Sequence, residues 1–461
     1  MIYFKKYILS LFIIFIFHTF VFSQPVPYEF FENKLKNILY DSGNNWDDLT
    51  AFGPSINYIS QSNEKRFSIE IKTGQKYSNY STQLFIYSRF KFRKNLFGVF
   101  YPKYSKNSNL FNWFSNIPVN SVEEHKKFYF ELSGITYHKN WVTIQLGRGR
   151  ESWGAGSDIQ LALNERSNPY DYFSLSSDYG KIRVKYVHGF LEKVFEDQNR
   201  YIVARGIEFT NKKSSVIGIS EIVIYSGLNR SFDIAHFNPI SSHLETEFND
   251  RLNFPGSSGA NAVWQFHFDY LFKKSVRLSW NFLIDELVLD KDYESNKQGS
   301  KATSSKISFS ILKSKKHLLN LYFKHIFVGS FTFSHWNGTN NFVQSNKPLG
   351  WVNGSDGEEF SCGFNYIYNN KLITSLNLGL LKSGQKSIKY NPYVPYVGYD
   401  KQKFPTGIVK KNNLGSLCFI YKMKLNSNIF INIDLDQNSI NTKKELEVAI
   451  GLNLDLYRKL N

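Results

Sequence analysis

The segment from Gly147 to Ser157 combines residue types that could recognise a charged or planar ligand. It holds Arg148, Arg150, Glu151 and Trp153 in the run Gly-Arg-Gly-Arg-Glu-Ser-Trp-Gly-Ala-Gly-Ser. An arginine can bind a carboxylate through paired hydrogen bonds, and a tryptophan ring offers a stacking plane. A phosphate-binding loop would need a Lys-Ser or Lys-Thr pair and a following helix, and the sequence indicates neither. Four glycines in ten positions indicate a tight backbone, so we expect a constricted, charged loop that lies against or inside the fold.

Histidines are the other side chains that could carry chemistry. His267 and His325 lie in predicted strands, with Asp269 two positions after His267, while His335 precedes Trp336 in a predicted loop. No Ser-His-Asp order or paired-carboxylate spacing can be recognised, and Cys and His are scattered without metal-ligand spacing. We therefore expect no enzyme activity, no catalytic residue, no metal and no cofactor. A hydrolase that uses His335 or His267 is kept as the second alternative.

The first 23 residues have the pattern of a secretory signal peptide. Lys5 and Lys6 precede an apolar run from Tyr7 to Phe22, and compact residues precede a cleavage site near Ser23. An uncleaved anchor helix is the alternative reading, because the run approaches the shortest length that spans a membrane. We expect export from the cytoplasm and localisation in the cell outer membrane.

Basic residues exceed acidic ones in the chain. The formal net charge is +17, and +15 remains when Lys5 and Lys6 are lost with the signal peptide. An exported chain of this charge favours anionic partners, such as lipopolysaccharide headgroups or acidic sugars. Because the lysines are dispersed and the chain is exported, we expect no nucleic-acid partner. Solvated loops rich in Lys and Asn would account for the same charge.

Strict two-residue alternation from Ala262 to Asp285 is the clearest indication of the fold. Side chains alternate across a strand, so this stretch predicts two strands, each with one apolar and one polar face, joined by a turn at Lys273-Lys274. Each strand has about ten residues and ends in aromatics, as a membrane-crossing strand requires. Aromatic residues make up 17% of the chain, which suits aromatic girdles at two membrane interfaces.

We therefore expect an all-β fold, a transmembrane antiparallel β-barrel of about 16–18 strands. The predicted strands lie near residues 55–60, 66–73, 82–92, 96–101, 127–137, 141–147, 180–191, 200–209, 215–225, 262–272, 275–284, 303–312, 317–326, 359–368, 371–381, 414–424, 427–436 and 445–456.

Turns and loops alternate in the C-terminal half, as short periplasmic turns and long outer loops do in such barrels. The turn at His138 to Asn140 falls on the wrong side of this alternation. We therefore expect one miscounted segment before it and another between residues 148 and 261.

Apolar residues recur at helical spacing in residues 28–45, which predicts a short amphipathic helix. It could cap the barrel mouth from the periplasm or form an edge helix of a soluble domain. The expected division is a signal peptide at 1–23, a periplasmic helical segment at 24–54 and an outer-membrane barrel at 55–461. Cys362 and Cys418 have opposite parities relative to their apolar neighbours, so we expect two free thiols.

Seven motifs follow one another along the chain: Gly147 to Pro169, Arg205 to Phe209, Gly218 to Glu221, Ile224-Tyr225, Phe237 to Pro239, Leu349-Gly350 and Gly354 to Asp356. Their order resembles that of the Wzi family of capsule-assembly outer-membrane proteins. The run Trp153-Gly154-Ala155-Gly156 corresponds to the family's Trp-Gly-Pro-Gly, and Leu163 to Arg166 replaces its small Ser-Asn-Ala context. The resemblance covers most of the mature chain.

The resemblance implies a non-enzymatic lectin at the cell surface that holds capsular or exopolysaccharide, acidic polymers included. Partners would be this polysaccharide together with outer-membrane lipid and lipopolysaccharide. Each tryptophan could instead anchor the barrel in lipid, and the Gly147 to Ser157 segment could be scaffold. An outer-membrane channel or porin for solutes is the first alternative. The candidate polysaccharide-binding residues are Arg148, Arg150, Glu151, Trp153, Trp336, Trp351 and Asp356, with Trp113 and Arg230 as further polar or aromatic groups in long loops.

Overall fold

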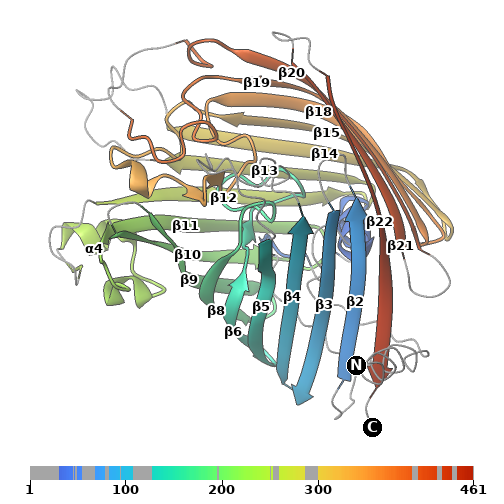
Figure 1. Ribbon diagram of the computed structural model, residues 1–461, viewed down its shortest axis with the longest axis horizontal. Helices are drawn as coiled ribbons and strands as arrows, with labels where there is room; N and C mark the ends of the chain where they lie inside the picture. Colours follow the sequence, from blue (N-terminus) through green and yellow to red (C-terminus); the bar gives the residue numbers. More distant parts are fainter. Residues whose placement is uncertain are drawn as a thin grey trace, which may run out of the picture.

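The polypeptide forms a closed antiparallel β-barrel in the computed structural model (Figure 1). Eighteen strands of the described residues take part. The ring closes where β2 (Ser68–Tyr77) pairs with both β3 (Thr82–Arg93) and β22 (Lys444–Lys459). In the part of the chain that is described, no helix is long and apolar enough to cross a membrane. The predicted transmembrane barrel of 16–18 strands is confirmed.

The structure describes residues 31–44, 46, 49–53, 68–77, 82–93, 95–106, 127–194, 197–249, 251–252, 259–285, 300–396, 403–422, 428–438 and 444–459. The predicted signal peptide, the predicted strand at 55–60 and Trp113 lie outside these residues.

The other barrel strands are β4 (Leu96–Lys106), β5 (Lys127–Lys139), β6 (Val142–Gly149), β8 (Tyr170–Asp178), β9 (Ile182–Val194), β10 (Gln198–Thr210), β11 (Ser215–Leu228), β12 (Ala260–Phe272), β13 (Val276–Asp285), β14 (Lys301–Lys313), β15 (His317–Val328), β18 (Gly357–Tyr368), β19 (Leu372–Ser383), β20 (Lys410–Lys422) and β21 (Asn428–Asn438). Two short ribbons pair β1 (Phe52–Gly53) with β7 (Ser152–Trp153) and β16 (Val343–Gln344) with β17 (Lys347–Pro348). The helices are α2 (Phe31–Asp41), α4 (His243–Phe248) and the 3₁₀ turns η4 (Ile234–Phe237) and η5 (Gly338–Asn340).

The hairpin of β12 and β13 shows how the alternation builds the wall. Phe266 and Trp280 are exposed on the outer face, whereas Gln265 and His267 are buried on the inner face. The turn residues Lys273 and Lys274 both have positive φ, as a two-residue hairpin turn of matching twist requires. The apolar side of the pattern is therefore the lipid-facing side of the barrel.

Strand β8 is absent from the predicted strands. Its presence restores the alternation of short turns and long loops. With β8 included, the turn near Asn140 lies at the same end of the barrel as the other short turns. Tyr170 and Tyr172 of β8 are buried inside, while Phe173 and Leu175 are the apolar residues of its outer face. Because aromatic residues occupy both faces, the strand shows no clear alternation. The expected miscount between residues 148 and 261 is confirmed.

Helix α2 lies inside the barrel near the end that carries the short turns (Figure 1). Its Phe31 and Ile38 pack against the inward side chains Leu318, Ile367 and Ile373, which follow or precede short turns. The predicted helix at 28–45 is thus confirmed over residues 31–41, as an element enclosed by the strands. The predicted division into a helical segment and a barrel at residue 54 stays a prediction.

An apolar core fills the barrel toward its long-loop end. Trp153 and Leu161, from the chain between β6 and β8, pack there with Leu349 and with inward residues of the wall such as Val263 and Leu283. Burial of apolar side chains from wall, loop and enclosed chain stabilises this interior as in a water-soluble domain.

Both cysteines are free, as predicted. Cys362 is exposed on the outer wall, whereas Cys418 is buried beside Phe31 of α2.

Candidate functional site

The chain between β6 and β8, residues 150–169, folds back into the lumen and is called the inner segment here. Its β7 pairs with β1, and Trp153 also forms an isolated bridge with Leu163. Toward the outer loops, the amide of Trp351 donates to Leu161 O at 3.0 Å and the amide of Asn164 donates to Leu349 O at 2.8 Å. This segment corresponds to the constricted, charged loop against or inside the fold that the sequence predicts.

Glycines permit the close approach of the inner segment to the wall. Gly154 has φ +130° and Gly156 has φ +75°, both in the region that favours glycine. A Cβ at Gly154 would lie 2.7 Å from Asn281 Oδ1. The same Asn281 Oδ1 accepts from Ala155 N at 2.7 Å, and Asn281 Nδ2 donates to Ala155 O at 3.0 Å. These positions therefore serve contact with the barrel.

Glu151 and Trp153 are buried and bind each other. Trp153 Nε1 donates to Glu151 Oε2 at 2.8 Å, and the Lys185 ammonium forms an ion pair with the same carboxylate. Lys185 Nζ also lies 5.9 Å from the centroid of the Trp153 ring, within range of a cation–π contact. The structure brings these two predicted site residues together, with their polar groups engaged inside the protein.

The two arginines of the motif point to different sides of the wall. Arg150 faces inward, where it forms an ion pair with Glu131 and donates to Ser167 O. Arg148 faces outward with the neighbouring strand's Asp171, and its Nη1 lies 2.9 Å from Asp171 Oδ2. A single ligand in the lumen therefore could not contact both arginines.

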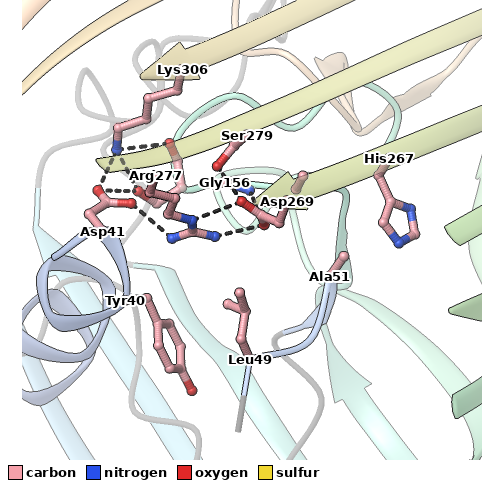
Figure 2. Close-up of polar contacts among 12 residues, drawn as sticks. Tyr40, Asp41, Leu49, Ala51, Gly156, His267, Asp269, Arg277, Ser279 and Lys306 are labelled. Carbon is pink, nitrogen blue, oxygen red and sulfur yellow. Dashed lines mark hydrogen bonds and ion pairs between the residues drawn. The ribbon is translucent and has the colours of Figure 1, made fainter. Parts of the chain in front are cut away.

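A charged cluster joins α2, the inner segment and the wall (Figure 2). Arg277 donates to Asp269 from Nε at 2.8 Å and from Nη2 at 2.7 Å, while its Nη1 donates to Asp41 Oδ1 at 2.9 Å. Lys306 Nζ donates to Asp41 Oδ2 at 2.6 Å and to Ser157 Oγ at 2.8 Å. All these charged groups are buried. Buried charges need partners of opposite sign, and here each cation contacts a carboxylate.

Two carboxylates of the inner segment meet in a more accessible part of the lumen. Arg166 Nη2 donates to Asp158 Oδ1 at 2.7 Å, and both side chains are exposed by more than 40%. Burial of Glu165 and the nearby Asp158 charge raise the pKa of the Glu165 carboxyl to about 7. Enclosure by the barrel also disfavours the charge of Asp158, although its side chain stays accessible to solvent, and Arg166 and Lys306 hold the pKa of Asp158 below its usual range.

Loop residues 329–356, 384–396 and 403–409, called the outer loops here, pack together at the long-loop end. Asp356 is buried and accepts from Ser330 Oγ at 2.8 Å, Lys386 N at 3.1 Å and Thr406 N at 2.9 Å. Trp351 is also buried, and its Nε1 donates to Glu359 Oε2 at 3.3 Å. These two predicted site residues therefore hold the outer loops in place.

Among the candidate tryptophans that the structure describes, Trp336 presents an aromatic face to solvent. Its side chain is 58% exposed and lies beside His335, with ring centroids 5.2 Å apart. Tyr390, which the sequence did not single out, is 40% exposed, and Lys410 Nζ lies 4.3 Å from its ring centroid. Tyr390 sits in a loop without strand alternation, so only its aromatic type beside Lys389 could have drawn attention to it.

The loops that carry Trp336 and Tyr390 are joined by hydrogen bonds. The amide of Tyr396 donates to His335 O at 3.3 Å, and Asn341 Nδ2 donates to Pro392 O and Val394 O at 3.1 Å each. The two loops that carry these exposed aromatic residues are thus packed against each other.

The histidines considered for hydrolysis lie in separate surroundings. His267 is buried in the lumen wall, with Nε2 3.7 Å from Glu208 Oε2. His325 faces outward, where Nε2 lies 3.1 Å from Glu358 Oε1. Within the described residues, no group of three His, Cys, Asp or Glu side chains could hold a metal ion.

The closed barrel with an apolar outer wall is that of an outer-membrane β-barrel protein, and solved structures agree. The chain is similar to Wzi of Escherichia coli, described as an outer membrane protein involved in group 1 capsule assembly and a carbohydrate-binding β-barrel. That match has a TM-score of 0.62 at 11% identity and covers 83% of this chain and 84% of Wzi. At this identity the likeness concerns the fold.

Porins are similar to the chain as well. OpdK of Pseudomonas aeruginosa, solved with vanillate, has a TM-score of 0.47 at 9% identity and covers 85% of this chain and 98% of that one. A BenF-like porin from Pseudomonas fluorescens has a TM-score of 0.48 at 8% identity, with the same coverage. No family model matches the sequence, and no curated protein matches it. The chain is an outer-membrane β-barrel protein.

Proposed function

We propose that this barrel binds polysaccharide at the cell surface and helps to retain capsular or exopolysaccharide there, without catalysis. The observation that carries the proposal is the exposure of Trp336 and Tyr390 on the outer loops, with Lys389 and Lys410 beside the Tyr390 ring. Aromatic rings stack on the apolar faces of sugars, and lysines attract carboxylates of acidic polymers. The net charge of +17 favours the same class of ligand.

The filled lumen also supports a binding role. The inner segment and the outer loops share one apolar core with the wall, and α2 is fastened below them by the cluster around Arg277. A solute could cross such an interior only if several of these buried contacts rearranged. We therefore infer that the candidate residues Arg150, Glu151 and Trp153 stabilise the packed lumen. Polysaccharide binding is assigned to the outer loops.

Retention of polysaccharide by the purified protein tests the proposal. Folded protein in detergent should be retained on an immobilised acidic polysaccharide, and Trp336→Ala or Tyr390→Ala should each weaken retention about two- to tenfold, through loss of roughly 0.5–1.5 kcal/mol of aromatic contact. Trp280→Ala, which removes an exposed tryptophan of the outer wall, is the matched control and should leave retention unchanged. Equal retention by all four proteins would contradict the assignment.

A channel is the second candidate, and one observation favours it. Asp158 and Arg166 are accessible to solvent although the barrel surrounds them, so polar space exists beside the inner segment. Current through planar bilayers distinguishes the two functions. The binding proposal predicts little steady current from the wild-type protein, whereas a large open conductance would favour the channel.

A further inference from the structure

The outward faces of β9, β10 and β11 are partly buried, unlike those of their neighbours. In β10, Ala204 belongs to the internal core and the Phe52 ring lies against Gly206, so the alternating residues Val203 and Arg205 face outward. Near the short-turn end of β10, the outward Phe209 is 48% exposed, as lipid contact requires. Toward the long-loop end the outward residues are buried, and this covered patch comprises Tyr186, His188, Tyr201, Val203, Arg205, Glu221, Val223 and Tyr225.

Residues 229–249, called the outer flap here, lie over the covered patch from outside the barrel. The segment connects β11 to β12 and contains η4 and α4, which projects beyond the strands in Figure 1. The Phe232 ring lies 4.8 Å from those of both Tyr201 and His188, and the Phe237 ring lies 4.7 Å from that of His188. Aromatic packing thus attaches the flap to the wall.

Hydrogen bonds join the flap to the hydroxyl groups of the patch. Tyr186 Oη donates to His236 O at 2.8 Å, and Tyr201 Oη donates to Arg230 O at 2.7 Å. The amide of Asp233 donates to Tyr225 Oη at 3.2 Å. A lipid chain could not supply these polar partners, so the flap replaces lipid on this part of the wall.

A buried ion pair lies beneath the flap on the outward side. Arg205 Nε is 2.9 Å from Glu221 Oε2, and both side chains are less than 8% exposed. Arg205 Nη1 donates to Asn238 O at 2.9 Å, and the amide of His243 donates to Glu221 Oε1 at 3.0 Å. Charged groups at a lipid-facing position are costly, and here flap backbone groups supply hydrogen bonds to both members of the pair.

Between residues 231 and 240 the far side of the flap exposes large apolar side chains and no charge, together with the uncharged polar residues Ser231 and Asn238. Ile240 is 90% exposed and Ile234 is 74% exposed, with Phe232 and Phe237 nearly half exposed. The charged residue of this stretch, Asp233, is buried in an ion pair with Arg230, Nη2 to Oδ2, at 3.0 Å. Apolar side chains of this size, concentrated on one short segment, need an apolar partner.

We propose that residues 231–240 of the outer flap lie against the outer-leaflet lipid and continue the lipid-facing surface of the barrel over β9 to β11. Its exposed residues, Phe232, Ile234, Phe237 and Ile240, contact acyl chains, and its inner side shields the Arg205 and Glu221 pair from them. Continuity with the apolar wall selects lipid as the occupant, because Phe209 and Ile217 of the same strands are exposed below the flap. The flap thus widens the membrane contact and is independent of polysaccharide binding.

Collision of spin labels with lipid-soluble oxygen and with a water-soluble nickel chelate tests the proposal. Full-length protein with Cys362→Ser and Cys418→Ser would carry a nitroxide at Ile240→Cys or, in a second variant, at Ile234→Cys, in vesicles that contain lipopolysaccharide. Phe209→Cys serves as the lipid-facing control and Asp197→Cys, at an exposed turn of the long-loop end, as the aqueous control. We expect both flap labels to collide more with oxygen than with nickel, as the label at residue 209 does.

Two outcomes would overturn the proposal. Nickel collisions at residues 234 and 240 equal to those at residue 197 would place the flap in water. Protection from both reagents would mean that a protein surface, such as a second copy of this chain, covers the flap. Binding of polysaccharide by the same labelled proteins would be unaffected in every case, so this test is separate from that of the proposed function.

Discussion

Glu151 and Asp171 each form an ion pair with a basic neighbour, one in the interior and one on the outer wall. Glu151 is buried with Lys185, whereas Asp171 is exposed on the outer wall with Arg148. Glu151→Ala leaves a buried ammonium unpaired and should destabilise the folded barrel by about 3–5 kcal/mol. Asp171→Ala should cost less than about 1 kcal/mol. Urea unfolding in detergent measures both, and equal losses would show that burial does not separate them.

Glu165 should make stability depend on pH. Its folded pKa of about 7 lies above the ordinary 4.5, so ionisation of this carboxyl opposes folding. Stability is highest below pH 4.5 for this group and falls as the pH rises through 7. Glu165→Gln should therefore remove a loss of roughly 1–3 kcal/mol between pH 5 and 8. Unfolding midpoints at the two pH values check this, with Asp197→Asn at an exposed turn as the control whose pH dependence stays that of the wild type.

The type and order of the candidate residues could be read from the sequence, but their depth in the fold could not. Trp153, Trp336 and Trp351 are alike as sequence features, and the structure buries two of them and exposes one. Parity assigns a side chain to a face only within a strand, and all three lie in connecting segments whose path depends on long-range packing. Arg148 and Arg150 are likewise close in sequence, yet Arg148 on β6 faces outward and Arg150 faces inward.

At the scale of elements, Asp41 should hold α2 inside the barrel. It accepts hydrogen bonds from both Arg277 and Lys306, so Asp41→Asn removes the charge that matches two buried cations. We expect the helix to loosen and current through planar bilayers to become larger and more frequent than in the wild type. Asp171→Asn, on the outer wall, should behave as the wild type. Unchanged current in Asp41→Asn would show that α2 is held by its apolar contacts alone.

Strands with one apolar face could be predicted from sequence to within a few residues, as β12 and β13 illustrate. β8 could not, because Tyr170 and Tyr172 face an internal core that is itself aromatic. Helix α2 was predictable from its periodicity, yet its enclosure depends on contacts with strands such as β15 and β19, far along the chain. The outer flap gave no periodic signal at all, since it packs through turns and single aromatic rings.

At the scale of the whole molecule, the two thiols report the two sides of the wall. Cys362 faces lipid and Cys418 lies beneath α2, so a charged maleimide should label neither in folded protein in vesicles and both after unfolding. Thiolate formation is disfavoured in apolar surroundings, which strengthens this protection. Mass spectrometry counts the labels, and Asp197→Cys supplies a position that should react at once. Rapid labelling of Cys362 in folded protein would contradict the assignment of its face to lipid.

The pairing of β2 with β22 makes the first and last strands of the barrel neighbours. Helix α2 precedes β2 in the chain, and the inner segment follows soon after, yet both end up enclosed by strands that come later. Once β2 pairs with β22, the barrel wall is continuous, and α2 and the inner segment can no longer enter between two strands. We therefore expect the N-terminal contents to be in place before β22 pairs with β2 in the last step of assembly.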